Sequence, residues 1–399
     1  MPKQITMVRW SATNVPYGVA FDENTGIFSG TPANAGDYVV PVTVETNYGK
    51  DTKDVALNIE DLKNQWREFT VDTGIALQDC VDNGQEIIFF GKNSSYKGGI
   101  FFTYKPSDNT YSDIYKLIDG AKYSNETDGT SYNFKSCVQD PVSKKWLAFF
   151  GKNYIRTPSG VKDLGSDVDF TCIATCWANS LQKFCVIGQS SGGELTSYLF
   201  DVDGNLLDKS SSINLVSNFK LYSTSNTNRS RDSVLCWSDK ENKFVAISNS
   251  SNVIAYSSDG LNWNRTTISG VTLLDTGRVI YRLEELGLFI LSSGRITLSG
   301  NQGIASSSIY TSQDGITWTK IKSLTNLMPT KIAWSESKQI LCMVGYYKGS
   351  YITKDFTEWE LINTENTTLD FTGELIWSDT ANAFISPQGN TNKFLRLKI

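Results

Sequence analysis

Histidine is absent from all 399 residues of the sequence. Imidazole is the base of Ser-His-Asp and Cys-His sites, it supplies the zinc ligands of HExxH motifs, and it is the commonest ligand of transition metals. Each of these mechanisms is therefore excluded. Any catalysis would have to rely on carboxylates, tyrosine and arginine.

The sequence also lacks a block of charge of one sign and a long apolar run. There are 37 Lys plus Arg against 42 Asp plus Glu, a formal net charge of −5, spread along the chain. Nucleic acid and anionic membrane surfaces are therefore not expected as partners. No apolar run approaches the roughly 20 residues of a membrane-spanning helix, and the first residues lack the apolar core of a signal peptide. We expect no signal peptide and no membrane insertion.

Cysteine is scarce, and its pattern indicates structural thiols. The seven cysteines show no CxxC pairing and lie mostly inside apolar runs, at Cys80, Cys137, Cys172, Cys176, Cys185, Cys236 and Cys342. This predicts buried free thiols in a protein folded under reducing conditions, with no disulfide framework.

Asp201–Asn205 is similar to the start of a calcium loop but lacks the downstream glutamate, and it is interpreted as a hairpin turn. We expect no metal and no cofactor.

Hydrophobic residues are 40% and aromatic residues 12% of the chain, which is enough for a substantial core. Residues 1–61 alternate short strands with Gly, Pro and Asn turns, a pattern typical of a small antiparallel sandwich. The run Val19-Ala20-Phe21-Asp22, Thr25-Gly26, Ser29-Gly30-Thr31-Pro32 and Ala35-Gly36-Asp37-Tyr38 closely resembles the Putative Ig family of bacterial and phage surface proteins. The resemblance implies a spacer or docking domain.

The remainder, residues 62–399, repeats one unit: an apolar anchor, a short polar turn and an apolar strand. Clear copies begin at Cys176, Cys236, Ala333 and Ile376, and weaker ones at Cys80, Cys137 and Ile280. Their spacing of roughly 40 to 60 residues is typical of propeller blades. The predicted fold is all-β, a small Ig-like sandwich followed by a seven-bladed β-propeller.

A second motif follows the first in three of the units. It resembles the Asp-box, or BNR repeat, of sialidase-type propellers, and its residues are Ser257, Asp259 and Trp263, then Ser312, Asp314 and Trp318, then Thr353, Asp355 and Trp359. The Asp and Ser/Thr side chains would bond amides of a tight turn, and the Trp would pack between neighbouring sheets. The resemblance implies a structural role, on the side opposite the binding surface.

The end of the chain predicts how the ring closes. Each box Trp opens an outer strand, but the seventh unit ends at Phe394–Ile399 without one. A matching segment begins at Trp66. Because an unclosed propeller exposes long sheet edges, we expect residues 66–72 to supply the outer strand of the last blade.

The Asp-box raises the question of sialidase activity. The family uses three arginines around a carboxylate, a Tyr-Glu pair and an acid/base Asp, and no arginine here lies in the Arg-Ile-Pro context that opens its catalytic domains. Other glycosidases need two carboxylates at a set separation, and nothing in the sequence selects a pair.

The repeated Gly91-Lys92-Asn93 and Gly151-Lys152-Asn153 lack the spacing of phosphate loops and are interpreted as equivalent turns.

A binding surface is the remaining hypothesis. Loops between the second and third strands of each blade gather on one face, among them Arg295 to Gly303. Here they are polar and aromatic, as are the long connections about 107–135 and 208–233. The candidate binding residues are Tyr96, Lys97, Tyr154, Arg156, Tyr222, Arg229, Arg295, Tyr346, Tyr347 and Lys348. Exposed tyrosines with Asn and Ser suit sugars or a protein partner.

Together these features look most like a bacteriophage virion protein, from the tail or the capsid, with a role in host attachment. The resemblance implies that the protein is made in the bacterial cytoplasm and then becomes part of the virion. The Ig-like domain would dock to other virion proteins in a larger assembly. The propeller loop face would bind a host glycan or a neighbouring virion protein. The alternatives are a structural or decoration protein with no ligand, and a glycan-cleaving propeller enzyme.

Overall fold

The computed structural model describes residues 8–16, 19–30, 36–59, 66–71, 75–93, 98–107, 110–122, 133–166, 168, 172–189, 194–210, 234–248, 252–268, 271, 277–299, 302–346, 350–362, 371, 373–389 and 391–399. The chain divides into two compact units, Met1–Gln65 with Lys398–Ile399, and Trp66–Leu397. Regular elements in the described ranges are all strands, so the predicted all-β class is confirmed.

The small unit contains a three-stranded antiparallel sheet and a separate hairpin. The sheet has the order β1 (Val8–Ala12), β4 (Gly36–Thr46), β5 (Gly49–Ile59), and the hairpin joins β2 (Val19–Phe21) to β3 (Phe28–Gly30). Gly26 adopts a φ of 71°, and a Cβ there would lie 3.2 Å from the Trp10 ring. Glycine therefore allows this turn to pack directly on the indole.

The large unit contains seven sheets in its described part, which we number in chain order. The first three comprise β7 (Ile75–Asp82), β8 (Ile87–Asn93), β9 (Gly99–Lys105), β10 (Thr110–Tyr111) and β11 (Tyr115–Lys116); β12 (Phe134–Gln139), β13 (Trp146–Phe150), β14 (Tyr154–Thr157) and β15 (Gly160–Asp163); and β16 (Cys172–Ala178), β17 (Lys183–Gln189), β18 (Leu195–Phe200) and β19 (Leu206–Lys209).

The fourth to sixth sheets comprise β20 (Leu235–Ser238), β21 (Lys243–Ile247), β22 (Val253–Ser257) and β23 (Asn264–Thr267); β24 (Gly277–Leu283), β25 (Leu288–Ser299), β26 (Gln302–Ser312) and β27 (Thr319–Thr325); and β28 (Met328–Ser335), β29 (Ile340–Tyr346), β30 (Ser350–Thr353) and β31 (Glu360–Ile362). The seventh joins β32 (Ile376–Ser378), β33 (Ala383–Pro387) and β34 (Lys393–Leu397) to β6 (Trp66–Thr70).

The turn between the first and second strands has the same backbone geometry in every one of these sheets. One residue of each such turn has a positive φ: Gly84, Lys144, Gln182, Asn242, Gly287, Gln339 and Asn382. This conformation suits glycine and is tolerated by asparagine. The repeated polar turn in the sequence is thus a repeated left-handed turn in the structure.

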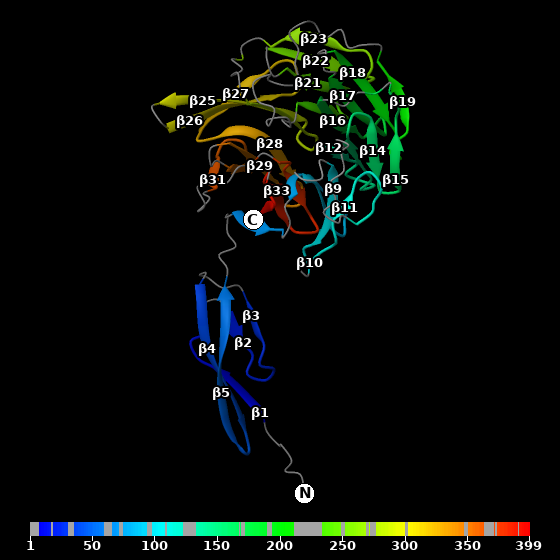
Figure 1. Cartoon of the computed structure of the whole chain (residues 1–399). Helices are drawn as coiled ribbons and strands as arrows, with labels where there is room; N and C mark the ends of the chain where they lie inside the picture. The colour runs from blue at the N-terminus through cyan, green and yellow to red at the C-terminus, as the bar shows by residue number, and fades with distance from the viewer. Residues whose placement is uncertain are drawn as a thin grey trace. The chain divides into compact units, whose positions relative to one another are not determined.

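The sheets follow one another around a ring (Figure 1). The first strand of each sheet contacts the first strands of the two adjacent sheets, and β32 of the seventh contacts β7 of the first. The blue strand β6 lies beside the red strands of the chain end, where it pairs antiparallel with β34, with Trp66 opposite Leu397 and Thr70 opposite Lys393. The seventh sheet therefore combines segments from the two ends of the large unit.

The core lies between the faces of adjacent sheets. One cluster joins the seventh sheet to the first through Phe89, Phe102 and Phe394, which are all fully or almost fully buried. Cys80, Cys137, Cys176, Cys185, Cys236 and Cys342 are buried and free, which confirms the predicted thiols for these six. The side chain of Cys172 lies outside the described part. Burial raises the pKa of all six thiols, so they are kept protonated and inert.

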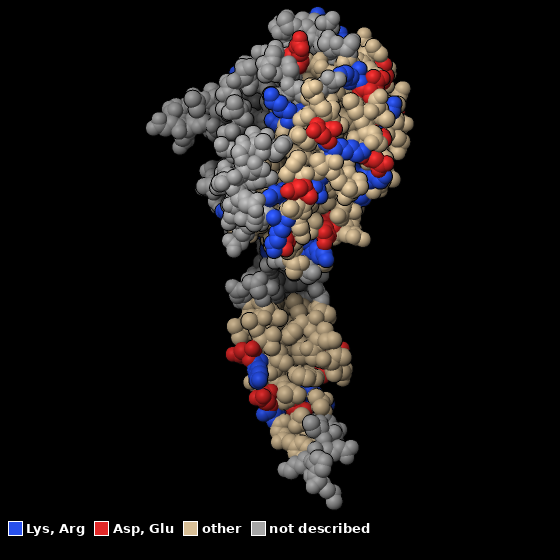
Figure 2. Space-filling model, turned by 45° about the vertical axis from the view of Figure 1, so that its right-hand side comes forward, with Lys and Arg blue, Asp and Glu red and all other residues tan. Residues whose placement is uncertain are grey.

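The charges on the visible surface are mixed in sign. In the face shown by Figure 2, basic and acidic side chains lie close to each other over the large unit, without an area of one sign. In the described ranges there is no helix that is long and apolar enough to span a membrane.

Candidate functional site

Most of the predicted binding residues cannot be placed. Tyr96, Lys97, Tyr222, Arg229, Tyr347 and Lys348 lie outside the described residues, as do 108–109 and 123–132 of the first long connection and 211–233 of the second. Tyr346 is the last residue of β29, and its side chain also lies outside the description. Tyr154, Arg156 and Arg295 can be examined directly.

Arg156 lies in a strand and not in a loop, which corrects the expected position. It is part of β14, half-buried, with Nη1 donating to the Leu117 carbonyl at 3.0 Å and the guanidinium 4.7 Å from the centre of the Phe101 ring. Desolvation lowers its pKa, against the opposing effect of Asp119. The side chain thus joins the second sheet to the first. Tyr154 begins the same strand and stacks on Phe150 at 5.5 Å.

The expected loop from Arg295 to Gly303 is a β-ribbon. Strands β25 and β26 continue in register beyond their neighbours, with Arg295 opposite Ser306 and Ser299 opposite Gln302. Figure 1 shows the two strands extending from the ring. Arg295 is exposed at the base of this ribbon. Continuous pairing of Ser, Thr and Ile residues explains why the segment is a strand where a loop was expected.

Three turns between third and fourth strands share one hydrogen-bonding pattern. Asp259 Oδ1 accepts the amides of Leu261 and Asn262, each at 2.8 Å, and Ser257 Oγ accepts the Gly260 amide at 2.9 Å. Asp314 with Ser312, and Asp355 with Thr353, accept the corresponding amides of their own turns. Burial opposes ionisation of Asp259 and Asp314, but these amide bonds outweigh it and lower the pKa of each to about 2.

The three tryptophans that follow these turns pack against adjacent sheets. Trp318 is buried, and Trp263 packs on the same cluster, which contains residues of the third, fourth and fifth sheets. Trp359 packs on a cluster of the fifth and sixth sheets. Phe356 has a φ of 63° at the position that Gly260 and Gly315 occupy in the other two turns.

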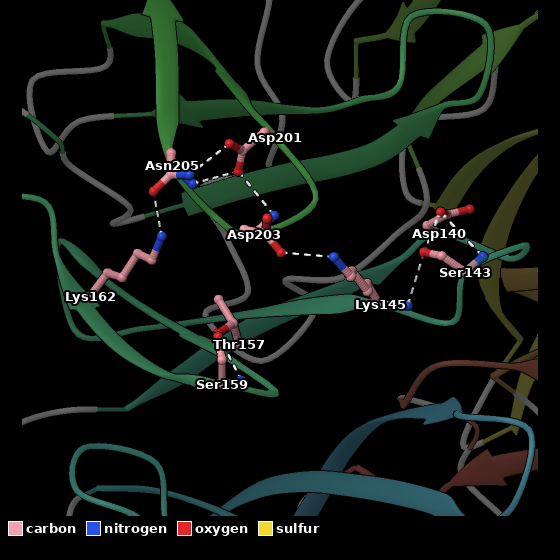
Figure 3. A network of polar contacts seen from close by, with 9 residues as sticks. All are labelled: Asp140, Ser143, Lys145, Thr157, Ser159, Lys162, Asp201, Asp203 and Asn205. Atoms are coloured by element: carbon pink, nitrogen blue, oxygen red, sulfur yellow. Dashed lines mark hydrogen bonds and ion pairs between the residues drawn. The ribbon is translucent and has the colours of Figure 1, made fainter.

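Asp201–Asn205 forms the turn between β18 and β19, which confirms the predicted hairpin. Asp201 Oδ1 accepts the amides of Asp203 and Asn205 at 2.9 and 2.8 Å. Two lysines of the second sheet reach this turn (Figure 3): Lys145 pairs with Asp203 at 2.8 Å, and Lys162 donates to Asn205 Oδ1 at 2.5 Å. The oxygens that a cation would need are used to hold the hairpin and to join two sheets.

A cluster of ionisable side chains near the first strands, which we call the axial cluster, consists of Asp79, Asp82, Lys331 and Glu374. Lys331 Nζ lies 2.7 Å from Glu374 Oε2, and the lysine side chain is only 4% exposed. All four charges act on the Cys80 thiol between them, although burial is the largest cause of its raised pKa. The cluster therefore spans the first, sixth and seventh sheets, where the ring closes.

Each carboxylate of the axial cluster accepts hydrogen bonds from nearby donors. Asp79 accepts the amides of Cys80 and Cys137, both at 2.9 Å. Asp82 accepts the Ser378 hydroxyl and the Thr380 hydroxyl, each at 2.7 Å, from the seventh sheet. Glu374 accepts the Leu375 amide at 3.2 Å in addition to Lys331. The arrangement closes a ring, and its carboxylates are already coordinated by donors.

Sequence reasoning missed the axial cluster. Its one signal was a charged residue inside an otherwise apolar first strand, such as Lys331 between Met328 and Ala333. No group of three or more His, Cys, Asp or Glu side chains in the described part of the chain is arranged to hold a metal ion.

A family model described as Putative Ig domain matches residues 2–60. No curated protein matches the sequence.

Solved structures, among them a β-propeller domain, resemble the chain over most of its length. A catalytically inactive virginiamycin B lyase from Staphylococcus aureus with quinupristin aligns with a TM-score of 0.56 at 9% identity, over 84% of this chain and 99% of that chain. The β-propeller domain of Cps50 (Swd1) from Myceliophteria thermophila aligns at 0.52 and 11% identity, over 83% and 98%. Kuenenia stuttgartiensis hydrazine synthase aligns at 0.53 and 9% identity, over 83% and 97%. The chain therefore combines an N-terminal Ig-like domain with a β-propeller.

Proposed function

We propose that this protein is a non-enzymatic virion protein, a phage tail or capsid accessory protein. In this proposal residues 1–61 form an Ig-like sandwich that docks to other virion proteins. Residues 62–399 form a seven-bladed propeller of the Asp-box type, closed by residues 66–72. Its loop face binds a host-surface glycan or a neighbouring virion protein.

The non-enzymatic part of the proposal rests on the hydrogen bonds of three carboxylates in the axial cluster. Asp79, Asp82 and Glu374 each accept hydrogen bonds from backbone amides, hydroxyls or an ammonium group. A glycosidase needs one carboxyl group free to give a proton and a second free to attack or to activate water. Carboxylates that hold strands together do not provide that pair.

Activity of the lyase type is not favoured either. Replacing one histidine by alanine makes the virginiamycin B lyase catalytically inactive, and the present chain contains no histidine. A propeller scaffold without that residue type supports binding better than it supports this chemistry, because function depends on the site and not on the fold.

The loop face is the surface with the chemistry for a ligand. Arg295 is exposed at the base of the β25–β26 ribbon. In this proposal the other Tyr, Lys and Arg candidates of the loops between second and third strands lie at the same end of the sheets. Tyrosine rings stack on sugars, and arginine donates bidentate hydrogen bonds. The opposite turns are occupied by the Asp201, Asp259 and Asp314 hydrogen bonds that stabilise the sheets.

A glycan array probed with the full chain, with hydrolysis measured on every glycan retained, tests this function. We expect retention without hydrolysis, weakened by Arg295→Ala and not by Arg265→Ala, an exposed arginine on outer strand β23. Turnover that disappears on replacement of one loop-face carboxylate would establish the glycan-cleaving alternative. If no glycan is retained, incorporation into purified virions distinguishes a structural or decoration protein from a protein outside the virion class.

A further inference from the structure

Strand β5 is a long open edge of the small unit. It is the last strand in the order β1-β4-β5 and has 11 residues. Residues 49–54 are all exposed. In the described part of this unit no strand pairs with its outer side. Such an edge pairs with another chain unless its side chains prevent it.

The backbone groups that are free at this edge can be identified from Pro41. It lies opposite Asp54, it has no N–H, and its carbonyl accepts the Thr13 amide on the far side of β4. Pro41 and Asp54 are therefore a pair without mutual hydrogen bonds, and the N–H and C=O of Asp54 are directed to the open edge. By the two-residue alternation, Thr52 and Lys50 also direct their backbone groups outward.

The charges along this edge are self-complementary. The sequence Lys50-Asp51-Thr52-Lys53-Asp54 exchanges sign about Thr52. In an antiparallel pair of two such strands centred on Thr52, each Lys50 lies opposite Asp54 of the second copy. Each Asp51 lies opposite Lys53 of the second copy, and the two Thr52 residues face each other. Opposite charges and Thr–Thr are favourable cross-strand pairs.

Other registers are opposed by the same charges. In a β5–β5 pair, a residue whose backbone N–H and C=O point to the open edge must lie opposite another such residue. One strand can therefore shift along the other only by steps of two residues. The neighbouring symmetric registers place Asp51 opposite Asp51 or Lys53 opposite Lys53. The next ones place Lys50 opposite Lys50 or Asp54 opposite Asp54. Like charges directly opposite each other are destabilising, so the register centred on Thr52 is favoured over these four.

The charges in question are not neutralised within the unit. Asp51 and Lys53 lie opposite Val44 and Val42 of β4. Among the described residues, Asp51, Lys53 and Asp54 have no ion-pair partner, while Lys50 pairs with Glu45 at 3.0 Å. Lone charges of this kind usually protect an edge strand from pairing. Here their order opposes the four symmetric registers nearest to the one centred on Thr52 and favours that one.

We propose that β5 pairs antiparallel with β5 of a second copy of this chain, centred on Thr52, to form a two-fold symmetric dimer. This inference is independent of the proposed ligand of the propeller. The interface is isologous, so each contact occurs twice, and its ion pairs are exposed, so the dimer weakens as salt rises.

Sedimentation velocity of the full chain, over a range of concentrations and at low and high salt, tests the proposal. We expect a monomer–dimer equilibrium. Lys53→Asp and Asp51→Lys should each weaken association at least tenfold, because each change places like charges opposite each other twice. Glu23→Lys, an exposed change outside the edge, is the control and should leave association unchanged.

Mixing the two single variants gives the decisive result. In a mixed pair the reversed charges are again complementary, so Lys53→Asp and Asp51→Lys chains, each weakened alone, should form a heterodimer. The double variant carrying both changes should dimerise as the original chain does. The proposal is overturned if the original chain stays monomeric at all concentrations. It is also overturned if both single variants dimerise normally or if the mixture does not associate.

Discussion

The indole N–H of Trp66 donates a 2.7 Å hydrogen bond to Ser350 Oγ across 284 positions of sequence. Trp263 donates to Ser197 Oγ at 3.2 Å in an equivalent place. In both cases the tryptophan opens the fourth strand of a sheet, and the serine lies on the third strand of the preceding sheet. Trp66 therefore has the same role in the seventh sheet as Trp263 has in the fourth.

Trp66→Phe should destabilise the protein by about 1 kcal/mol, because it removes this bond but keeps the ring against Phe371. Trp66→Ala should cost about 3–5 kcal/mol. Urea unfolding measures both, and a cycle with Ser350→Ala isolates the pair. Trp318→Phe is the control, since the buried Trp318 N–H has no hydrogen-bond partner among the described residues. Equal costs at Trp66 and Trp318 would contradict the assigned role of the bond.

Removal of β6 should expose the edge of β34. A chain that starts at residue 66 keeps the pairing of Lys393 with Thr70, and a chain that starts at residue 75 loses it. We expect the shorter chain to unfold or to oligomerise, since an unpaired strand is a template for association. Light scattering and urea unfolding compare the two. A shorter chain that remains monomeric and unfolds cooperatively would show that closure does not depend on β6.

Glu374→Gln should destabilise the protein by about 3 kcal/mol. The change removes the carboxylate that pairs with the buried ammonium group of Lys331, and breaking a buried ion pair costs about 3–5 kcal/mol. The lower end applies because Glu374 is 26% exposed. Adding Lys331→Met should restore most of the loss, because it removes the buried ammonium charge itself. If the double variant is no more stable than Glu374→Gln alone, the buried charge is not the cause.

Acid should remove the stabilisation from Asp259 and Asp314. Burial alone would raise their pKa values, but hydrogen bonds to the turn amides outweigh it and lower each pKa to about 2. A lowered pKa contributes stability that is present above the unfolded value of about 3.9 and is lost as pH falls toward 2. We expect Asp314→Asn to cost about 1 kcal/mol at pH 7, after allowance for solvent screening, and progressively less between pH 4 and pH 2. A constant difference across that window would count against the assignment.

Gly315→Ala and Gly165→Ala separate backbone strain from crowding. Both glycines have positive φ, 69° and 76°, but a Cβ at Gly315 would lie 3.0 Å from Val245 of the preceding sheet, whereas a Cβ at Gly165 meets nothing within 4 Å. Gly165→Ala should cost about 1 kcal/mol from strain alone, and Gly315→Ala about 1–3 kcal/mol more. Thermal or urea unfolding measures the difference, and equal costs would rule out close packing of the turn.

The strand pattern was predictable because its periodicity is local. Anchors such as Trp237 and Trp377, each followed by a Ser-Asp turn, lead into pairs with Phe244 and Phe384. These signals lie within about ten residues of each other and depend on propensity and turn chemistry. They lead directly to the all-β class.

The candidate site was harder to predict because it depends on distant pairings. Nothing near Arg156 in the sequence indicates that Leu117 and Phe101 of another sheet would occupy its guanidinium. The Lys331–Glu374 pair likewise joins residues 43 positions apart. The segment beyond Arg295 was predicted as a loop, but cross-strand pairing, with Arg295 opposite Ser306 and Ser299 opposite Gln302, makes it a pair of strands.

The pairing of β6 with β34 also determines when the seventh sheet can be completed during synthesis. Thr70 leaves the ribosome long before its partner Lys393, and at about 5–20 residues per second the delay is roughly 15–65 seconds. During that interval the strands of the early sheets can pair with each other, while Trp66–Thr70 has no partner strand. A translation product that stops before β34 leaves β6 without its partner strand and leaves the seventh sheet unfinished. Such a product becomes a target for chaperones or proteases.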